Sequence, residues 1–319
     1  MKAAVYTTYG PPDVLKLRDV EKPAPSEDQV LIRVHSTTVN RTDYAALRGT
    51  PRLARVIYGF PRPKNPILGN EFAGEVEAVG SAVTTFAPGD RVFGYNDATY
   101  GAHAEYVAIP ERGMIAHMPD GLSYDEAAPT AEGAHYALKD IRKANVQPGQ
   151  HALVIGASGA IGSASVQLLK HFGAKVTAVC GTRNVELVRS LGADRVIDYT
   201  TEDFTGSGET YDFVHDAVGK SSFGVCRKLL KPGGIYCSSE LGRFSQNPFL
   251  ALWTSRFGSR KVIFPIPRTS KEDMEFLKGL IEAGEFRPVI DRRYPLDEIV
   301  EAFRYVGTER KTGNVVITV

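Results

Sequence analysis

A glycine-rich turn between an apolar run and a helical pattern constrains this chain most. The apolar run covers residues 151–155, and Gly156, Gly159 and Gly162 follow it in the segment LVIGASGAIG. A strand, a tight turn and a helix start present backbone N–H groups and the positive end of a helix, which can hold a diphosphate. The sequence therefore predicts a dinucleotide-binding unit. The alternative is that the three glycines serve only helix–strand packing.

Strands and helices alternate from about residue 123. The predicted strands cover residues 151–155, 175–180, 195–198, 213–216 and 234–238, with another near 262–264, and the predicted helices cover 161–172, 184–191, 222–230 and 271–283. Repeated β–α units imply a parallel sheet that is covered on both faces, with right-handed crossovers. This alternation also supports the dinucleotide-binding interpretation, because a lone glycine-rich turn is a weak signal.

The two ends of the chain have a different pattern. Residues 1 to about 120 are β-rich, with short strand candidates at 30–34, 75–79 and 104–107 that turn-forming residues separate. The proline-rich segment 49–66 is expected to form a loop with solvated basic residues. Near the C-terminus, strands at 288–290 and 315–317 flank a helix at 296–306. We expect this segment to return to the N-terminal part. A first domain, residues 1–122 completed by 286–319, would then carry the dinucleotide domain, residues 123–285, as an insertion.

Composition excludes several classes of partner. The net charge is +1, from 38 basic and 37 acidic side chains, which gives no electrostatic reason to expect nucleic acid or an anionic membrane as a partner. No stretch approaches the ~20 apolar residues of a membrane span, and the first residues lack a signal-peptide pattern. The three cysteines are widely spaced, which favours a reducing compartment. We therefore expect a cytoplasmic protein.

The end of the second strand of the dinucleotide unit indicates which cofactor binds. An NAD site carries an acidic side chain there, which accepts hydrogen bonds from the ribose. This chain instead continues with Gly181, Thr182 and Arg183, and no acid occurs before Glu186. A hydroxyl and a guanidinium would bind a 2′-phosphate, so the sequence predicts NADPH. The alternative for Arg183 is a solvated residue in the first turn of a helix.

The other cofactor contacts are expected where strands end, because ligands of open α/β sheets bind outside the carboxyl ends of the strands. The full predicted set is Gly156, Ser158, Gly159, Ala160, Ile161, Gly162, Gly181, Thr182, Arg183, Ala217, Val218, Gly219, Ser238, Phe264 and Asn314.

Blocks along essentially the whole chain resemble the medium-chain dehydrogenase/reductase superfamily, and within it the zinc-independent quinone oxidoreductase branch. They include ILGNEFAGEVEAVG, VQPGQHALVIGASGAIG and KTGNVVITV, in that order. The resemblance implies a GroES-like β-rich domain that carries a Rossmann domain, with the active site in the cleft between them. It also implies a homodimer, formed through the edge of the Rossmann sheet.

The chain departs from the zinc-dependent members at two positions. They carry Cys where this chain has Asn40, and His where it has Asn70. Asparagine is a poor zinc ligand, so no metal is expected, and no Lewis acid would stabilise an alkoxide. Relatives also commonly have Lys where this chain has Asn314, a difference without a functional interpretation at this level, and often Thr where it has Ala134, which removes one expected cofactor contact.

The expected chemistry is hydride delivery from NADPH to a quinone or an α,β-unsaturated carbonyl. By the resemblance, Asn40 and Tyr44 face the nicotinamide and are the catalytic candidates, because either could donate a hydrogen bond to the oxygen that gains charge. The structural alternatives are a turn-stabilising residue for Asn40 and a core aromatic for Tyr44. Two alternative functions are a reductase of enoyl thioesters or other activated alkenes, and an NADPH-binding protein with little turnover.

Overall fold

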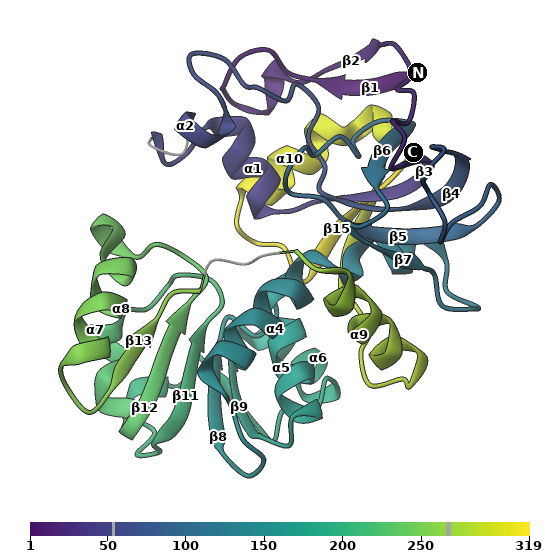
Figure 1. Cartoon of the computed structure of the whole chain (residues 1–319). Coiled ribbons are helices and arrows are strands. Elements are labelled where there is room, and N and C mark those ends of the chain that lie inside the picture. The colour runs from purple at the N-terminus through teal and green to yellow at the C-terminus, as the bar shows by residue number, and fades with distance from the viewer. Residues whose placement is uncertain (53–54, 266–268) are drawn as a thin grey trace. The chain divides into compact units, whose positions relative to one another are not determined.

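The computed structural model describes residues 1–52, 55–265 and 269–319, which form two compact units (Figure 1). Unit one comprises Met1–Glu132, Thr269–Ala283 and Pro288–Val319, and unit two comprises Gly133–Arg268 and Gly284–Arg287. The expected domain boundaries at residues 122 and 285 differ from these limits. Helix α3 (Tyr124–Ala127) packs on strands of unit one, and so does α9 (Lys271–Glu282). Both were expected in the dinucleotide domain.

Unit two contains, within the described residues, a six-stranded sheet in which every pairing is parallel. The strand order is β10-β9-β8-β11-β12-β13, which is the doubly wound Rossmann order. The expected Rossmann fold is therefore confirmed. The strands are β8 (His151–Ile155), β9 (Lys175–Cys180), β10 (Arg195–Asp198), β11 (Tyr211–Asp216), β12 (Leu230–Ser238) and β13 (Lys261–Ile263).

Five helices of the described chain accompany this sheet: α4 (Glu132–Ala144), α5 (Ala160–His171), α6 (Val185–Ser190), α7 (Phe223–Cys226) and α8 (Gln246–Arg256). The prediction of one helix over 222–230 was wrong, because the α-helix ends at Cys226, a 3-10 turn follows, and Leu230 already begins β12. Apolar residues of the strands, among them Leu153, Val214 and Tyr236, form the buried core. The three cysteines are buried as free thiols.

Unit one is built on a seven-stranded sheet, as far as the structure describes it, in the order β14-β15-β3-β4-β5-β7, with β6 also paired to β3. Its strands are β3 (Gln29–Val39), β4 (Glu71–Val79), β5 (Arg91–Tyr95), β6 (Tyr106–Pro110), β7 (Met114–His117), β14 (Ile290–Pro295) and β15 (Asn314–Thr318), beside the hairpin of β1 (Lys2–Val5) and β2 (Lys16–Asp19). The expected GroES-like β-rich part is confirmed.

The C-terminal segment joins this sheet directly. Strand β15 pairs antiparallel with β3, with Val315 opposite Val39, and β14 lies at the sheet edge beside β15. The predicted strand at 288–290 was wrong, because the strand begins at Ile290 and continues through Arg292 and Arg293. An edge strand tolerates such exposed charges, and its half-exposed sequence lacks the apolar run that marks a central strand.

Helices α1 (Arg41–Arg48) and α10 (Ile299–Gly307) pack against each other over one hydrophobic core of unit one. Leu47, Phe303 and Ile317 are among the buried residues of this core. Helix α1 ends at Gly49, whose positive φ of 58° closes it, and the short helix α2 (Arg55–Tyr58) follows. Residues 53–54 of the predicted loop 49–66 lie outside the described residues. No helix in the described parts of the chain has the length and apolar character that a membrane crossing needs.

Candidate functional site

The glycine turn of unit two is closed by contacts that only glycine permits. A Cβ atom at Gly162 would lie 2.1 Å from the carbonyl oxygen of Gly156, and one at Gly156 would lie 2.5 Å from the methyl groups of Val218. Gly156 also has a positive φ of 79°, which side chains rarely adopt. The structure therefore brings three predicted cofactor residues into direct contact at the end of β8.

The start of α5 is open to a ligand. Gly159 is the N-cap residue, and no side chain within the described residues caps this twelve-residue helix. A Cβ atom at Gly159 would meet nothing closer than 3.6 Å, so this glycine, unlike Gly156 and Gly162, is not enforced by a close contact within the protein. Uncapped N–H groups and the positive helix end suit an anion. The residues at this turn therefore fit the diphosphate of a dinucleotide.

The other predicted cofactor residues of unit two lie at the same edge of the sheet. Because all its strands are parallel, their carboxyl ends lie together. Gly181–Arg183 follow β9, Ala217–Gly219 follow β11, Ser238 ends β12 and Phe264 follows β13. Asn314 is the exception, because it begins β15 in unit one.

Asp216 holds the segment that follows β11 in place. Its Oδ1 accepts hydrogen bonds from the N–H groups of Val218 and Lys220 (both 3.3 Å), and its Oδ2 accepts from Ser221 N at 2.9 Å and from the Tyr236 hydroxyl at 3.2 Å. The sequence prediction gave Asp216 no such role. The signal was a carboxylate at the end of a buried apolar strand, where it must find donors.

The adenosine end of the predicted site has two neighbours that the prediction missed. The hydroxyl of Thr182 lies 2.8 Å from the hydroxyl of Thr200, and the side-chain hydrogen bond from Thr182 helps to hold the pKa of Asp198 below its usual value. Tyr199 is 63% exposed, and its hydroxyl would lie 3.3 Å from a Cβ atom at Gly181. The two missed neighbours, Thr200 and Tyr199, follow β10 directly. Only the sheet order places β10 beside β9.

Unit one holds a buried polar cluster around Glu71, which is itself fully buried. Its Oε1 accepts from the N–H groups of Ala131 (3.0 Å) and Glu132 (2.6 Å). Its Oε2 accepts from the Thr38 hydroxyl (2.6 Å) and from Asn40 Nδ2 (3.1 Å). Four donors on one carboxyl group favour its ionised form.

Burial and mutual electrostatic interaction shift the pKa values of the ionisable groups in this cluster. Burial raises the pKa of Glu71 to about 8, with a further increase from Glu132. Burial also raises the pKa of Asp43 and of Glu132, each to about 7. Lys311 is the nearby cation, and desolvation lowers its pKa to about 8 although both Glu132 and Glu71 oppose that shift. The cluster therefore gathers three carboxyl groups around one ammonium group.

Asn40 is tied into this cluster. Its Nδ2 donates to Glu71 and also to Asn314 Oδ1 at 3.1 Å, and its backbone N–H donates to Asp43 at 2.9 Å. Both amide hydrogens therefore have acceptors inside the protein, which is unfavourable for donation to a substrate. Asn314 donates in turn to the carbonyl of Val289 at 3.1 Å. The structure thus brings two predicted residues, Asn40 and Asn314, into direct contact in unit one.

Tyr44, the second catalytic candidate, lies one turn further along α1. It is half-buried against the core that α10 covers. A Cβ atom at Gly307, the last residue of α10, would lie within 2.8 Å of the Tyr44 ring and hydroxyl. This packing agrees with the core-aromatic alternative.

The residues at the zinc-ligand positions of the metal-dependent relatives do not fit a zinc ion. Asn40 and Asn70 supply amides in place of a thiolate and an imidazole. Glu71 spends both oxygens on four hydrogen-bond donors. In the described residues, no group of three or more His, Cys, Asp or Glu side chains is arranged to hold a metal ion. His103 is buried and hydrogen-bonded to the carbonyl of Thr38 at 2.7 Å.

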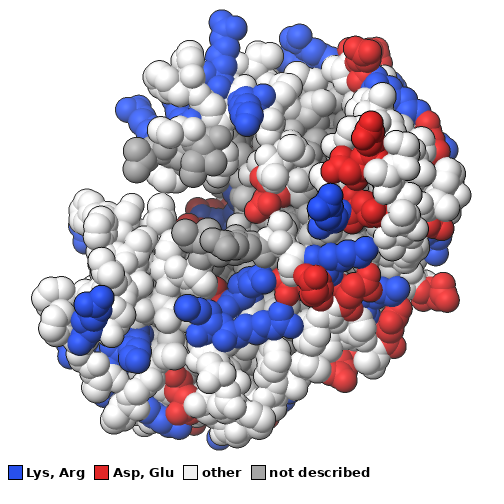
Figure 2. Space-filling view, in the orientation of Figure 1, with Lys and Arg blue, Asp and Glu red and all other residues white. Residues whose placement is uncertain are grey.

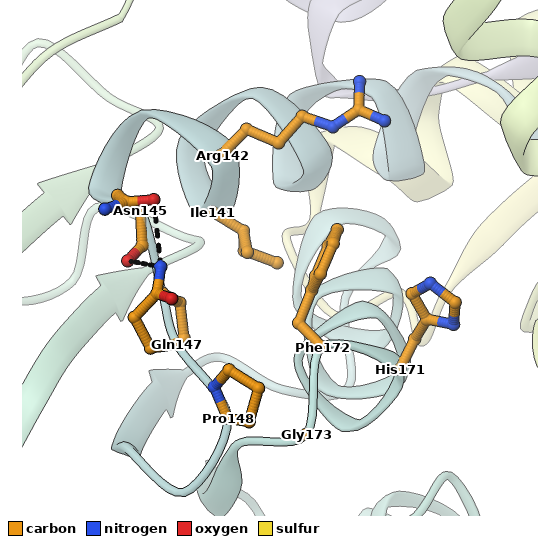
Figure 3. A pocket seen from close by; sticks show the side chains of 9 residues that line it. Ile141, Arg142, Asn145, Gln147, Pro148, His171, Phe172 and Gly173 are labelled. Carbon is orange, nitrogen blue, oxygen red and sulfur yellow. Dashed lines mark hydrogen bonds between the residues drawn. The ribbon is translucent and has the colours of Figure 1, made fainter.

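A surface pocket of about 520 Å³ in unit two lies away from the predicted site. The C-terminal ends of α4 and α5 line it with Arg142, Asn145 and Phe172, together with Pro148 and Gly173 (Figure 3). Residues 148 and 173 precede β8 and β9, so the pocket is at the amino ends of the strands. The glycine turn is at the carboxyl ends, and the two features are therefore separate.

Comparisons with known proteins agree with this architecture. The family described as "Alcohol dehydrogenase GroES-like domain" matches residues 26–120, and the family described as "Zinc-binding dehydrogenase" matches residues 191–317. The chain is 36% identical to the 2-methylene-furan-3-one reductase of Solanum lycopersicum and 34% identical to the chloroplastic NADPH-dependent alkenal/one oxidoreductase of Arabidopsis thaliana. Each alignment covers 99% of this chain and 79% of the relative.

A solved structure, the quinone oxidoreductase from Coxiella burnetii, superposes with a TM-score of 0.89 at 28% identity and covers 100% of this chain and 99% of that one. The chain belongs to the medium-chain dehydrogenase/reductase superfamily, in its quinone oxidoreductase branch. It is therefore an oxidoreductase of a family that binds a nicotinamide dinucleotide.

Proposed function

We propose that this protein is a zinc-free, NADPH-dependent reductase of quinones or α,β-unsaturated carbonyl compounds. The similar proteins carry names of this kind, namely a 2-methylene-furan-3-one reductase, an alkenal/one oxidoreductase and a quinone oxidoreductase. Asparagines at residues 40 and 70 support the zinc-free part of the proposal, because amides are poor ligands for that ion. Acceptors that draw electrons need no Lewis acid to accept hydride.

The cofactor is held by unit two in this proposal. The glycine turn and the uncapped start of α5 bind the diphosphate, and Val218 packs beside them. When bound, NADPH supplies the hydride. The single observation that carries the choice of NADPH is the segment after β9, where Thr182 and Arg183 stand in place of a ribose-binding acid. Asp198 is the neighbouring acid, and it already accepts hydrogen bonds from the N–H group and the hydroxyl of Thr200.

Asn40 and Tyr44 have different roles in this proposal. Asn40 is a positioning residue, because its amide joins Glu71 of β4 to Asn314 of β15 and so fixes the start of α1. The Tyr44 hydroxyl remains the candidate donor to the substrate oxygen on this helix. Its packing against α10 would fix the ring, and a rigid donor stabilises developing charge without reorganisation.

The cofactor choice is tested by the Arg183→Ala variant. Loss of one charge-assisted hydrogen bond to the 2′-phosphate should weaken NADPH binding about 10- to 150-fold and leave NADH binding nearly unchanged. Titration calorimetry with both cofactors measures this difference. Arg189→Ala is the matched control, because Arg189 lies further along on α6 and pairs with Glu186. Equal losses for NADPH and NADH in Arg183→Ala would contradict the assignment.

The reaction is tested by following NADPH oxidation with ortho-quinones, enones and an enoyl thioester, and NADP⁺ reduction with primary alcohols. Turnover with a quinone or an enone and none with the alcohols is the expected result. Preference for the enoyl thioester would favour the enoyl reductase alternative. Tight NADPH binding without turnover of any acceptor would favour a binding protein instead.

A further inference from the structure

Unit two contains a buried chain of hydrogen bonds that the proposed function does not use. The Nδ1 atom of His215 lies 2.9 Å from the Ser165 hydroxyl, and its Nε2 atom lies 2.9 Å from Asp140 Oδ2. Ser165 and His215 are 0% exposed, and Asp140 is 4% exposed. Figure 2 shows other acidic side chains at the surface of the molecule, where water solvates them. A buried carboxyl group must instead be held by donors of the protein.

These contacts indicate which ring nitrogen of His215 carries the hydrogen. A carboxylate only accepts hydrogen bonds, so Nε2 donates to Asp140. Nδ1 then has a lone pair and accepts from the hydroxyl of Ser165. Burial raises the pKa of the Cys237 thiol, and Asp140, to which the thiol is hydrogen-bonded, raises it further. The thiol therefore keeps its hydrogen and is a second donor to Asp140.

A hydroxyl, an imidazole and a carboxylate in this order are also the parts of a nucleophilic triad. That role does not fit this network, because a substrate would have to reach the hydroxyl of Ser165, which has no exposed area. Every residue of α5 from 162 to 169 is buried. The network must therefore act through the elements that it joins.

The network joins two helices to the sheet of unit two. Asp140 lies on α4, Ser165 on α5 and His215 on β11. The two helices also contact each other directly, because a Cβ atom at Gly133 would lie 2.7 Å from the carbonyl oxygen of Ala160. Helices α4 and α5 are therefore fixed to each other near their starts and to the sheet through His215.

Two residues of the network lie close to the predicted diphosphate site. Ser165 follows Ala160, the first residue of α5, by five positions, which is about 7.5 Å along a helix. A displacement of Ser165 therefore also moves the uncapped N–H groups at the helix start. His215 directly precedes Asp216, which holds the segment after β11. Successive strand residues point to opposite faces of a sheet, so His215 bonds to the helices on one face while Asp216 bonds to Tyr236 on the other.

We propose that His215 is a positioning residue for the dinucleotide, because its hydrogen bonds to Ser165 and Asp140 set where α5 begins relative to the loop after β11. A hydrogen bond has a narrow range of length and direction, so it fixes a helix more closely than apolar contacts do. Without it, part of the binding free energy is lost in ordering α5. The inference rests on the dinucleotide-binding part of the proposed function. It does not depend on the choice between NADPH and NADH, because both carry the same diphosphate.

The Ser165→Ala variant tests the proposal, because it removes the bond to α5 and leaves His215 joined to Asp140. Binding of NADPH and of NADH should each weaken about tenfold, since the hydrogen bond that fixes α5 is lost. Adenosine 2′-monophosphate lacks the diphosphate and should bind to the variant as it binds to the unmodified protein. Titration calorimetry with the three ligands measures these affinities.

Ser163→Ala is the matched control, because Ser163 is also buried on α5 but its hydroxyl donates within its own helix, to the carbonyl of Ala160 at 3.2 Å. It should leave the affinities for both cofactors unchanged. Unchanged cofactor affinities in Ser165→Ala, or equal losses in the two serine variants, would overturn the proposal. Equal weakening of adenosine 2′-monophosphate and the cofactors in Ser165→Ala would overturn it too, because a general loosening of unit two would then be the cause.

Two substitutions of His215 separate its hydrogen bonds. Asparagine places an amide oxygen near the position of Nδ1 and can still accept from Ser165, whereas glutamine places an amide nitrogen near the position of Nε2 and can still donate to Asp140. The affinity of His215→Asn for NADPH should exceed that of His215→Gln, because only asparagine keeps the bond to α5. The reverse order would contradict the proposal. Circular dichroism verifies folding, and the two serine variants decide the question if the His215 variants do not fold.

Failure of the proposed cofactor choice gives a different result. If the unmodified protein binds NADH more tightly than NADPH, or if Arg183→Ala weakens both cofactors alike, the choice of NADPH is wrong. A loss of NADH affinity in Ser165→Ala but not in Ser163→Ala would still support the role of His215.

Discussion

Single glycines decide whether the turn after β8 can form. At Gly162 the obstacle to a side chain is backbone, the carbonyl oxygen of Gly156 at 2.1 Å, and backbone cannot move aside as the end of a flexible side chain can. At Gly279, inside α9, nothing lies within 4 Å of an added Cβ atom. The same substitution should therefore have opposite effects at the two positions.

We expect Gly162→Ala to destabilise the protein by at least about 1 kcal/mol, because the start of α5 must shift. It should also abolish tight binding of the nicotinamide dinucleotide. Gly279→Ala should stabilise the protein by about 0.5–1 kcal/mol, because alanine loses less conformational freedom in a helix. Urea unfolding and cofactor titration of both variants measure these effects. Equal stabilities would show that the turn can relax around a methyl group.

Lys311 supplies the positive charge near the buried carboxyl groups of unit one. We expect Lys311→Met to destabilise the protein by about 3 kcal/mol, because it leaves Glu71 and Glu132 without that charge. Lys22→Met removes the exposed pair with Glu77 and should leave the stability nearly unchanged, because solvent screens the charges of such a pair. Denaturant midpoints compare the two, and a loss no larger than that of the control would mean that the carboxyl groups simply stay protonated.

At the scale of elements, the hydrophobic pattern of the sequence predicted the buried, regular strands correctly. The predicted strands 151–155, 175–180 and 195–198 match β8, β9 and β10, because parallel strands are buried on both faces and read as apolar runs. Helix α8 was missed, because its apolar residues face outward and its buried positions are polar, which removes the usual pattern. Strand β14 was misplaced because its charged residues lie at a sheet edge.

In the candidate site too, local features could be predicted from the sequence and long-range contacts could not. The glycine turn was predictable because its spacing reflects local backbone geometry. The contacts of Asn40 with Glu71 and Asn314, and of Thr182 with Thr200, were not, because they join residues distant in sequence. Such contacts follow from sheet order and register, which a single sequence encodes only indirectly. The roles of the predicted cofactor and catalytic residues remain predictions.

At the scale of the whole molecule, the buried cluster should control how stability depends on pH. The folded protein holds the pKa values of Asp43, Glu71 and Glu132 near 7 to 8, whereas unfolded carboxyl groups titrate near 4. Between these limits the folded state binds more protons than the unfolded state. Stability should therefore fall as pH rises from about 5 to about 8.

Thermal unfolding at several pH values measures this slope. Glu132→Gln should flatten it, because one of the three groups no longer titrates, whereas Glu301→Gln on the exposed face of α10 should leave it unchanged. A slope of the opposite sign in the unmodified protein would show that the four donors on Glu71 outweigh its burial and keep the cluster ionised throughout.

The pairing of β15 with β3 has a consequence for synthesis on the ribosome. The side of β3 from Ser36 to Val39 that pairs with β15 stays unpaired until residues 315–318 have emerged, and the bond from Asn40 to Asn314 spans 274 positions. All strands of unit two are translated before that moment. Unit one is therefore begun before unit two and completed after it. A nascent polypeptide that lacks β15 would leave one side of β3 without its hydrogen-bonding partner.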